Sequence, residues 1–189
     1  MADIVYPVTP VPFLPGSQAK DGEETLPVVD EYGQVKAQMS REYAHSGSKV
    51  LHPVVHLHLV DRMGRVYLQQ RAEWRRFFPG KWDTAAAGHV TFGETIREAL
   101  FREVREELGI KDFNPVWLDT YVYESADERE LVHVFVAVGN FNPSPGADEV
   151  TAGRYWTDKE IFSTAGRKKL TPGFYKEYRR LSGAMKALL

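Results

Sequence analysis

The strongest constraint on this chain is an amphipathic helix predicted across residues 95–108, in the stretch TIREALFREVREEL. Thr95 and Glu98 have the spacing of a capping box, in which each side chain accepts a hydrogen bond from the other residue's backbone N–H. Gly109 follows, at the position where a residue in the left-handed backbone conformation commonly ends a helix. The apolar residues recur every three or four positions and form one stripe, made of Ile96, Ala99, Leu100, Val104 and Leu108. The chain therefore has to bury one side of this helix against another element.

Three carboxylates border the apolar stripe, from Glu103, Glu106 and Glu107. Residues three and four apart are neighbours on a helix, and like charges at that spacing cost about 0.2–0.5 kcal/mol per pair. A solvated helix face tolerates this cost, because glutamate is a good helix former. The alternative is a hard cation such as Mg²⁺, which takes several oxygen ligands and commonly bridges carboxylates to substrate phosphates. The spacing alone leaves both interpretations open.

Several short strands are predicted on either side of this helix in the sequence. Residues 26–30 and 34–38 flank the turn residues Glu31, Tyr32 and Gly33, which is typical of a hairpin. A short helical turn is predicted after the hairpin, at residues 40–45. Runs of apolar and β-branched residues predict further strands at residues 52–61, 66–71, 117–125, 130–138 and 152–156.

A second helix is predicted near the C-terminus, where Thr171 can cap and Pro172 occupies the first helical position. Strands and helices alternate along the chain without a regular βαβ rhythm, and hairpins recur. We therefore predict an α+β fold in which a mixed sheet is sandwiched between helices, an α/β/α arrangement.

The composition narrows the class of protein. The chain has 189 residues, 43% of them hydrophobic, which is enough for one domain with a proper core. There are no cysteines, which excludes disulfides, thiolate metal sites and a cysteine nucleophile. A net charge of -2 gives no basic footprint, so we expect no duplex nucleic acid as a partner. No apolar run approaches the ~20 residues that span a bilayer, so we expect no membrane contact.

The first 25 residues are rich in proline and lack the basic start of a signal peptide. We expect a cytoplasmic protein with two parts, an extended arm at residues 1–25 and a folded domain at residues 26–189. An arm of this kind can exchange between two subunits, so a homodimer is one arrangement that the sequence allows.

A fixed frame of residues surrounds the carboxylate helix, in the stretch GHVTFGETIREALFREVREELGI. It consists of Gly88, Glu94, Arg102, Glu103, Glu106, Glu107 and Gly109. This frame, G-x5-E-x7-R-E-V-x-E-E-L-G-I, resembles the Nudix box at every defined position. The resemblance implies the Nudix fold, with the box as a loop–helix–loop. It also implies a MutT-like pyrophosphatase that uses Mg²⁺ or Mn²⁺ to hydrolyse a diphosphate bond, usually in a nucleoside diphosphate derivative.

The resemblance also implies a role for each residue of the box. The metal ligands would be the Gly88 carbonyl and the carboxylates of Glu103, Glu106 and Glu107. Arg102 would pair with Glu94 and hold the box loop against the helix. Such metals neutralise the diphosphate and lower the pKa of a bound water. Glu106 or Glu107 would then take the proton from that water.

Outside the box, the chain resembles type I isopentenyl diphosphate isomerase and the isomerase-like Nudix hydrolases. The resemblance runs from about residue 26 to residue 156, through EYAHSGSKVLHPVVH, LQQRAEWRRFFPGKWDTAAAGH and DERELVHVF. It implies a second metal, held by His45, His52, His89, Glu128 and Glu130. Such a mixed nitrogen and oxygen site suits Zn²⁺, Mn²⁺ or Fe²⁺ better than Mg²⁺. It also implies that Arg71 and Arg75 bind the substrate diphosphate.

One departure separates the chain from the isomerases. They use a cysteine two residues before the third histidine of the metal site, and here that position is Ala87. The isomerases also carry a degenerate Nudix box, whereas this box is intact. The sequence therefore favours a hydrolase of organic diphosphates. The alternatives are an isomerase of a prenyl diphosphate and a Nudix domain that senses a nucleotide without turnover.

Two further histidines, His56 and His58, fall on the same face of the strand that begins at His52. We expect both to be half-buried, hydrogen-bonded structural residues rather than ligands.

Overall fold

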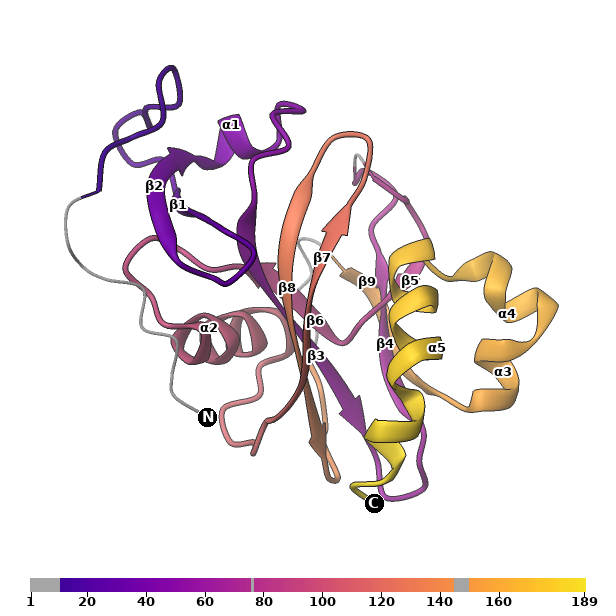
Figure 1. The fold of residues 1–189 in the computed structure, drawn as a ribbon. Coiled ribbons are helices and arrows are strands. Elements are labelled where there is room, and N and C mark those ends of the chain that lie inside the picture. The colour runs from indigo at the N-terminus through magenta and orange to yellow at the C-terminus, as the bar shows by residue number, and fades with distance from the viewer. Residues whose placement is uncertain (1–10, 76, 145–149) are drawn as a thin grey trace. The chain divides into compact units, whose positions relative to one another are not determined.

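The computed structural model describes residues 11–75, 77–144 and 150–189 (Figure 1). Its strands are β1 (Thr25–Val29), β2 (Val35–Ser40), β3 (His52–Val60), β4 (Val66–Arg71), β5 (Trp82–Asp83), β6 (Ala86–His89), β7 (Val116–Glu124), β8 (Arg129–Val138) and β9 (Val150–Trp156). Its helices are α1 (Arg41–Ala44), α2 (Ile96–Leu108), α3 (Asp158–Phe162), α4 (Thr164–Lys169) and α5 (Pro172–Lys186). The predicted α+β class is confirmed, as are the hairpin, the helical turn and the two helices whose caps the sequence indicates.

The larger sheet has its strands in the order β5-β4-β3-β8-β7, with β6 beside β3 and β9 beside β4. The pairs β3–β4, β4–β5 and β4–β9 are antiparallel, and a parallel bridge joins Trp82 to Leu170. The chain divides into two compact units. The first consists of residues 1–55, 88–102 and 119–133, and the second of residues 56–87, 103–118 and 134–189.

The first unit contains the small β1–β2 sheet. The strands pair in antiparallel register, with Leu26 opposite Met39. Their inward side chains form an apolar cluster with α1, made of Leu26, Val28, Ala37, Met39 and Ala44. Ser40 caps α1 by accepting a hydrogen bond from the Tyr43 backbone N–H. Part of the predicted arm lies against this sheet, because Gln38 exchanges backbone hydrogen bonds with Pro12 and Leu14. Residues 1–10 of the arm lie outside the described residues, and its boundary at residue 25 stays a prediction.

The register of β3 and β4 assigns side chains to the two faces of the sheet in the second unit. Leu59 pairs with Tyr67, so their side chains share a face, and alternation places Gln69 and Arg71 on that face too. The side chain of Gln69 there contacts Glu107 of α2. His58 points to the opposite face, where α5 covers it. Within this unit the sheet therefore has helices on both faces, as the predicted α/β/α arrangement requires.

Helix α5 is held on its face by a buried carboxylate. Glu177 accepts hydrogen bonds from His56 Nδ1 at 3.0 Å and from His58 Nε2 at 2.6 Å, and the side chains of Glu177 and His58 are almost fully buried. Phe174 and Tyr178 pack against the His58 ring. Both histidines are hydrogen-bonded, as expected, but their partner comes from a helix, and His58 is buried where a half-buried residue was expected.

Two short helices, α3 and α4, were not predicted from the sequence. Thr157 and Glu160 form a complete capping box at the start of α3, and this signal stands in the sequence as T-x-x-E. Ile161 is the only buried residue of α3, so its run has no apolar periodicity to detect. Within the described part of the chain, the longest helices are too short and too polar to cross a membrane.

Candidate active site

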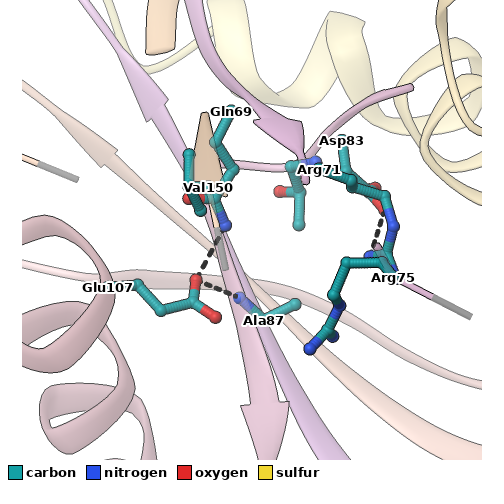
Figure 2. Close-up of a pocket in the computed structure, with 8 residues that line it drawn as sticks. Gln69, Arg71, Arg75, Asp83, Ala87, Glu107 and Val150 are labelled. Atoms are coloured by element: carbon teal, nitrogen blue, oxygen red, sulfur yellow. Dashed lines mark hydrogen bonds and ion pairs between the residues drawn. The ribbon is translucent and has the colours of Figure 1, made fainter. Parts of the chain in front are cut away.

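A pocket in the second unit brings together both predicted arginines and one glutamate of the box (Figure 2). Its lining residues come from β4, the loop after β4, β5, β6, α2 and β9. They are Gln69, Arg71, Arg75, Asp83, Thr84, Ala87, Glu107 and Val150. The pocket therefore combines cationic side chains with a carboxylate at one concave site, which is the arrangement expected of a ligand site.

Arg71 is fixed in the pocket by the loop that follows it. Its Nε donates to the Phe77 carbonyl at 3.0 Å, and its Nη1 lies 3.4 Å from Asp83 Oδ2. The loop returns to the strand at Gly80, whose φ of +67° is the left-handed conformation that favours glycine. A Cβ atom at Gly80 would also lie 2.4 Å from Glu73 Oε1. Arg75, which lies in the same loop, lines the pocket together with Arg71.

Asp83 connects the pocket to the C-terminal helix. While its Oδ2 faces Arg71, its Oδ1 accepts hydrogen bonds from the Thr84 backbone N–H at 2.9 Å and from Thr171 Oγ1 at 3.0 Å. Thr171 is also the N-cap of α5. One carboxylate therefore orients an arginine of the pocket and anchors a helix of the same unit.

The three glutamates of the box lie at different degrees of exposure on α2. Glu106 is exposed, whereas Glu103 and Glu107 are half-buried. Glu107 lines the pocket, and its Oε2 accepts hydrogen bonds from Gln69 Nε2 at 2.8 Å and from the Ala87 backbone N–H at 3.3 Å. Ala87, where the isomerases carry cysteine, thus also lines the pocket.

The pair Glu94 and Arg102 lies in the first unit. Arg102 Nε donates to Glu94 Oε1 at 2.7 Å and Arg102 Nη2 to Glu94 Oε2 at 2.9 Å, so the contact is bidentate. Burial raises the pKa of Glu94, but the hydrogen bonds from Arg102 and the Thr91 backbone outweigh it and leave the pKa below its usual value. Arg102 also donates to the His89 carbonyl at 2.9 Å. The loop before α2 is therefore attached to the helix. A role for the Gly88 carbonyl stays a prediction.

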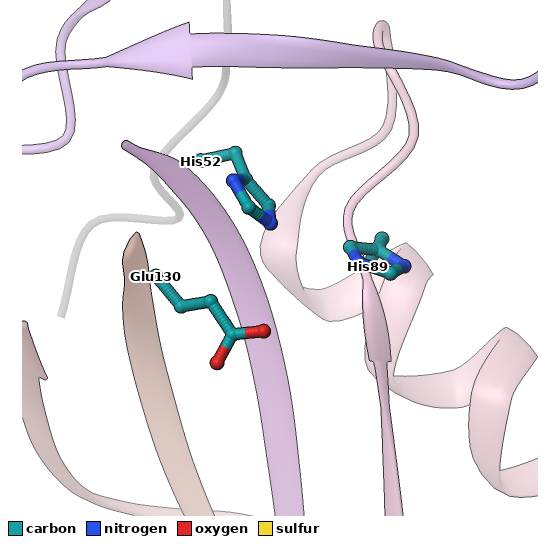
Figure 3. Close-up of side chains that lie close together, drawn as sticks. All are labelled: His52, His89 and Glu130. Carbon is teal, nitrogen blue, oxygen red and sulfur yellow. The ribbon is translucent and has the colours of Figure 1, made fainter. Parts of the chain in front are cut away.

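A histidine cluster occupies another part of the first unit (Figure 3). His52 begins β3, His89 ends β6 and Glu130 lies near the start of β8. One potential ligand atom from each of these residues lies within 4.8 Å of the others. The His45 ring is 5.0 Å from the His89 ring and 6.5 Å from the His52 ring, between centroids. His45 Nδ1 contacts the Glu128 carboxylate. Of the five residues that the isomerase resemblance singled out, His52, His89 and Glu130 have converging ligand atoms. His45 lies beside them and contacts Glu128, and these two are not part of that group.

The chemistry of His52 fits a metal ligand. Its Nδ1 donates to the Val50 carbonyl at 2.9 Å, which fixes the tautomer and leaves Nε2 as an acceptor. Nε2 is buried and has no hydrogen-bond partner among the described residues. Burial lowers the pKa of His52. Burial also holds the pKa of His89 well below its usual value, and the electrostatic effects of His52 and Arg41 add to this. Both imidazoles are therefore neutral near pH 7, the form that binds a metal.

Sequence reasoning missed Gln69, Asp83 and Glu177. Gln69 and Asp83 line the pocket, and Glu177 accepts hydrogen bonds from two histidines of β3. None of the three stands in a motif, and each acts on a residue at least 12 positions away in the chain. No local pattern could have identified them.

Solved structures with the same fold define the class of this chain. DR0079 from Deinococcus radiodurans matches with a TM-score of 0.70 at 21% identity, over 83% of this chain and 98% of that one. The MutT NUDIX hydrolase from Burkholderia pseudomallei matches with a TM-score of 0.57 at 22% identity, over 71% of this chain and 97% of that one. The domain therefore has the Nudix fold.

Sequence comparison identifies the family. The NUDIX domain matches residues 50–180, which is more than half of the chain. A relative from Mycolicibacterium vanbaalenii, named isopentenyl-diphosphate Delta-isomerase, is 37% identical over 144 residues, covering 72% of this chain and 78% of the relative. The chain belongs to the Nudix family and is similar to its isopentenyl-diphosphate-isomerase branch.

Proposed function

We propose that this protein is a metal-dependent Nudix hydrolase that cleaves the diphosphate bond of a nucleoside diphosphate derivative or a related organic diphosphate. The observation that carries the proposal is the pocket in which Arg71, Arg75 and Glu107 meet. Two guanidinium groups suit the oxygens of a diphosphate, because they donate paired hydrogen bonds and keep their charge. A carboxylate beside them suits a hard cation that shares the phosphate oxygens.

In this proposal the arginines and the glutamates have different roles. Arg71 and Arg75 bind and orient the diphosphate, and Asp83 holds Arg71 in place. Glu103, Glu106 and Glu107 hold Mg²⁺ or Mn²⁺, which, when bound, lowers the pKa of water and stabilises charge on the phosphate oxygens.

In the proposed reaction, each bond that forms is matched by one that breaks, and a residue of the chain accepts the proton. The water oxygen forms a bond to phosphorus, the bridging P–O bond breaks, and the proton of the water passes to Glu106 or Glu107. The products are a monophosphate and the remaining phosphorylated group. Glu94 and Arg102 support this chemistry by holding the loop of the box on its helix.

Isomerisation of a prenyl diphosphate is the second candidate, because relatives of the chain are named isopentenyl-diphosphate Delta-isomerase. The position of Ala87 argues against it. A methyl group cannot donate or accept a proton, and Ala87 lines the pocket where the isomerases have cysteine. A nucleotide sensor would need the fold and the arginines but no activated water, so the intact box argues against that alternative.

The deciding experiment is a panel of diphosphate compounds incubated with the protein and Mg²⁺ or Mn²⁺. The panel contains nucleoside diphosphate sugars, dinucleoside polyphosphates, ADP-ribose and isopentenyl diphosphate. We expect release of a monophosphate from at least one compound. Dimethylallyl diphosphate formed from isopentenyl diphosphate would favour the isomerase instead. Tight binding without turnover would favour the sensor.

The histidine cluster supports a second proposed metal, held by His45, His52, His89, Glu128 and Glu130. Three imidazoles and two carboxylates favour Zn²⁺, Mn²⁺ or Fe²⁺. The buried, unpartnered His52 Nε2 is the observation that favours this site, because an orphan acceptor in a cluster of ligand groups has no other evident partner. The cytoplasmic location and the homodimer stay predictions.

A further inference from the structure

Gln69 is a buried polar residue in the wall of the pocket, and it has contacts that a packing role does not require. It is only 8% exposed. Its Nε2 donates to Glu107 Oε2 at 2.8 Å, and the same oxygen accepts the Ala87 backbone N–H at 3.3 Å. Two neutral donors from two strands therefore fix one oxygen of a carboxylate that belongs to the Nudix box (Figure 2).

The contact with Glu107 also fixes the orientation of the Gln69 amide. A carboxylate only accepts hydrogen bonds, so the NH₂ group has to face it and the carbonyl oxygen has to point elsewhere. That oxygen, Oε1, is buried and has no hydrogen-bond partner among the described residues. A buried acceptor without a partner costs free energy, and a water molecule commonly satisfies it. Leucine would fill the same volume without this cost.

We propose that Gln69 is a positioning residue that acts through Glu107. Its Nε2, together with the Ala87 backbone N–H, holds Glu107 Oε2 and so keeps this side chain in one rotamer. The other oxygen of Glu107 is then left for the metal or for the proton of the attacking water. Gln69 itself neither gains nor loses a proton. The inference rests on the proposed function and adds a residue that lies outside the box.

The test compares Gln69→Leu, Gln69→Glu and the unchanged protein, with the panel compound that is turned over as substrate. We expect Gln69→Leu to lower kcat about 10–100-fold with KM within about twofold, because residues that orient a metal ligand contribute this much. We expect its Mn²⁺ affinity, titrated without substrate, to fall by a similar factor. Gln69→Glu places two carboxylates side by side, which forces them to share a proton. The acidic limb of its pH–rate profile should therefore move to higher pH.

Gln70→Leu is the matched control, because Gln70 points to the other face and donates to the Gly80 carbonyl at 3.0 Å. It should retain the Mn²⁺ affinity and the pH profile. Unchanged kcat, unchanged Mn²⁺ affinity and an unmoved acidic limb in the Gln69 variants would overturn the inference. If the leucine variant fails to fold, the isosteric glutamate variant decides through its pH profile and Mn²⁺ titration. Absence of turnover by the unchanged protein would count against the proposed function alone, because the Mn²⁺ titration still tests Gln69.

Discussion

The arginine pocket of the second unit and the histidine cluster of the first differ in how they hold charge. The pocket contains the guanidinium groups of Arg71 and Arg75 and the carboxylate of Asp83, which forms an ion pair with Arg71. The cluster uses buried imidazoles that stay neutral, because burial lowers the pKa of His52 and His89. A charged pocket suits an anionic substrate with a hard cation, whereas neutral nitrogens suit a transition metal.

Because of this difference, substitutions in the pocket and in the cluster should change different measurable properties. Changes in the pocket should alter turnover with little effect on the fold. Changes in the cluster should alter the retention of a transition metal and the stability that the metal confers. The variants below are arranged from the largest expected effect to the smallest.

The largest effect is expected from Glu106→Gln and Glu107→Gln. Each should cut kcat by about 10²–10⁴-fold, because a group that transfers a proton commonly contributes this much. Neither should lower the stability of the metal-free protein, since each substitution removes one of three mutually repelling charges. Steady-state kinetics and urea denaturation measure the two quantities. Asp112→Asn, an exposed carboxylate beyond the end of α2, is the control and should leave both unchanged. Near-normal rates in both glutamine variants would show that the box helix presents only a solvated face.

The next effect concerns the cluster. A transition metal that binds only the folded protein stabilises it by about 2.7 kcal/mol at a concentration 100 times its Kd. We therefore expect Zn²⁺ or Fe²⁺, which are proposed for the cluster but not for the box glutamates, to raise the Tm of the unchanged protein, and His52→Gln to lose this shift. Glu107→Gln should retain the shift if pocket and cluster are separate sites. A Tm that no transition metal raises would remove the second metal from the proposal.

The sequence predicted different parts of the molecule unequally. Helices α2 and α5 were predictable because their caps and apolar stripes lie within one short stretch. Helix α3 has the capping box but only one buried residue. It therefore lacks an apolar stripe, and it was not predicted. Spacing singled out the three glutamates as a cluster on one helix, but their role as metal ligands was implied only by a resemblance. The same is true of the roles of Arg71, Arg75 and the histidines.

No sequence pattern indicated the residues that support the two sites and the scaffold. Gln69 contacts a glutamate 38 positions away, and Glu177 contacts histidines 119 and 121 positions away. Such pairs form only when the sheet register and the helix positions are set, and no local periodicity encodes them. The sequence therefore singled out the groups that are proposed to have a chemical role, but not Gln69, Asp83 or Glu177, which contact other residues of the sites.

A third polar cluster sharpens the contrast between the histidines proposed as ligands and the other histidines of β3. His56 Nδ1 and His58 Nε2 each have Glu177 as partner, unlike His52 Nε2, which has no partner among the described residues. Burial raises the pKa of Glu177, but the charge and hydrogen bonds of the two histidines outweigh it and hold the pKa well below its usual value. Its contribution to stability is therefore complete above the pKa of the unfolded chain, near 4.5, and is lost as the pH falls from there towards the folded pKa.

Glu177→Gln should therefore lower the free energy of unfolding by about 2 kcal/mol at pH 7, the size of a hydrogen bond to a charged group. The difference from the unchanged protein should shrink below pH 4.5, where the unfolded carboxylate becomes protonated and the unchanged protein loses its advantage. Urea denaturation at pH 7 and at pH 3.5–4 measures both effects. A difference that stays constant with pH would mean that Glu177 is not the ionised partner of the histidines. The transition-metal shift of Tm should be the same in both proteins.

The smallest effect is expected from Thr157→Ala, in a part of the second unit that contributes only to the scaffold. Thr157 Oγ1 accepts the Glu160 backbone N–H at 3.3 Å, and Glu160 Oε2 accepts the Thr157 backbone N–H at 2.8 Å. Alanine removes the first bond and leaves one N–H of α3 without its cap, so the free energy of unfolding should fall by about 1 kcal/mol. Thr164→Ala is the control, since Thr164 is exposed and Ser163 caps its helix, and it should change stability by less. Turnover and metal binding should be equal in both variants. A Thr157→Ala variant with normal stability but altered turnover would show that α3 belongs to the working part of the molecule.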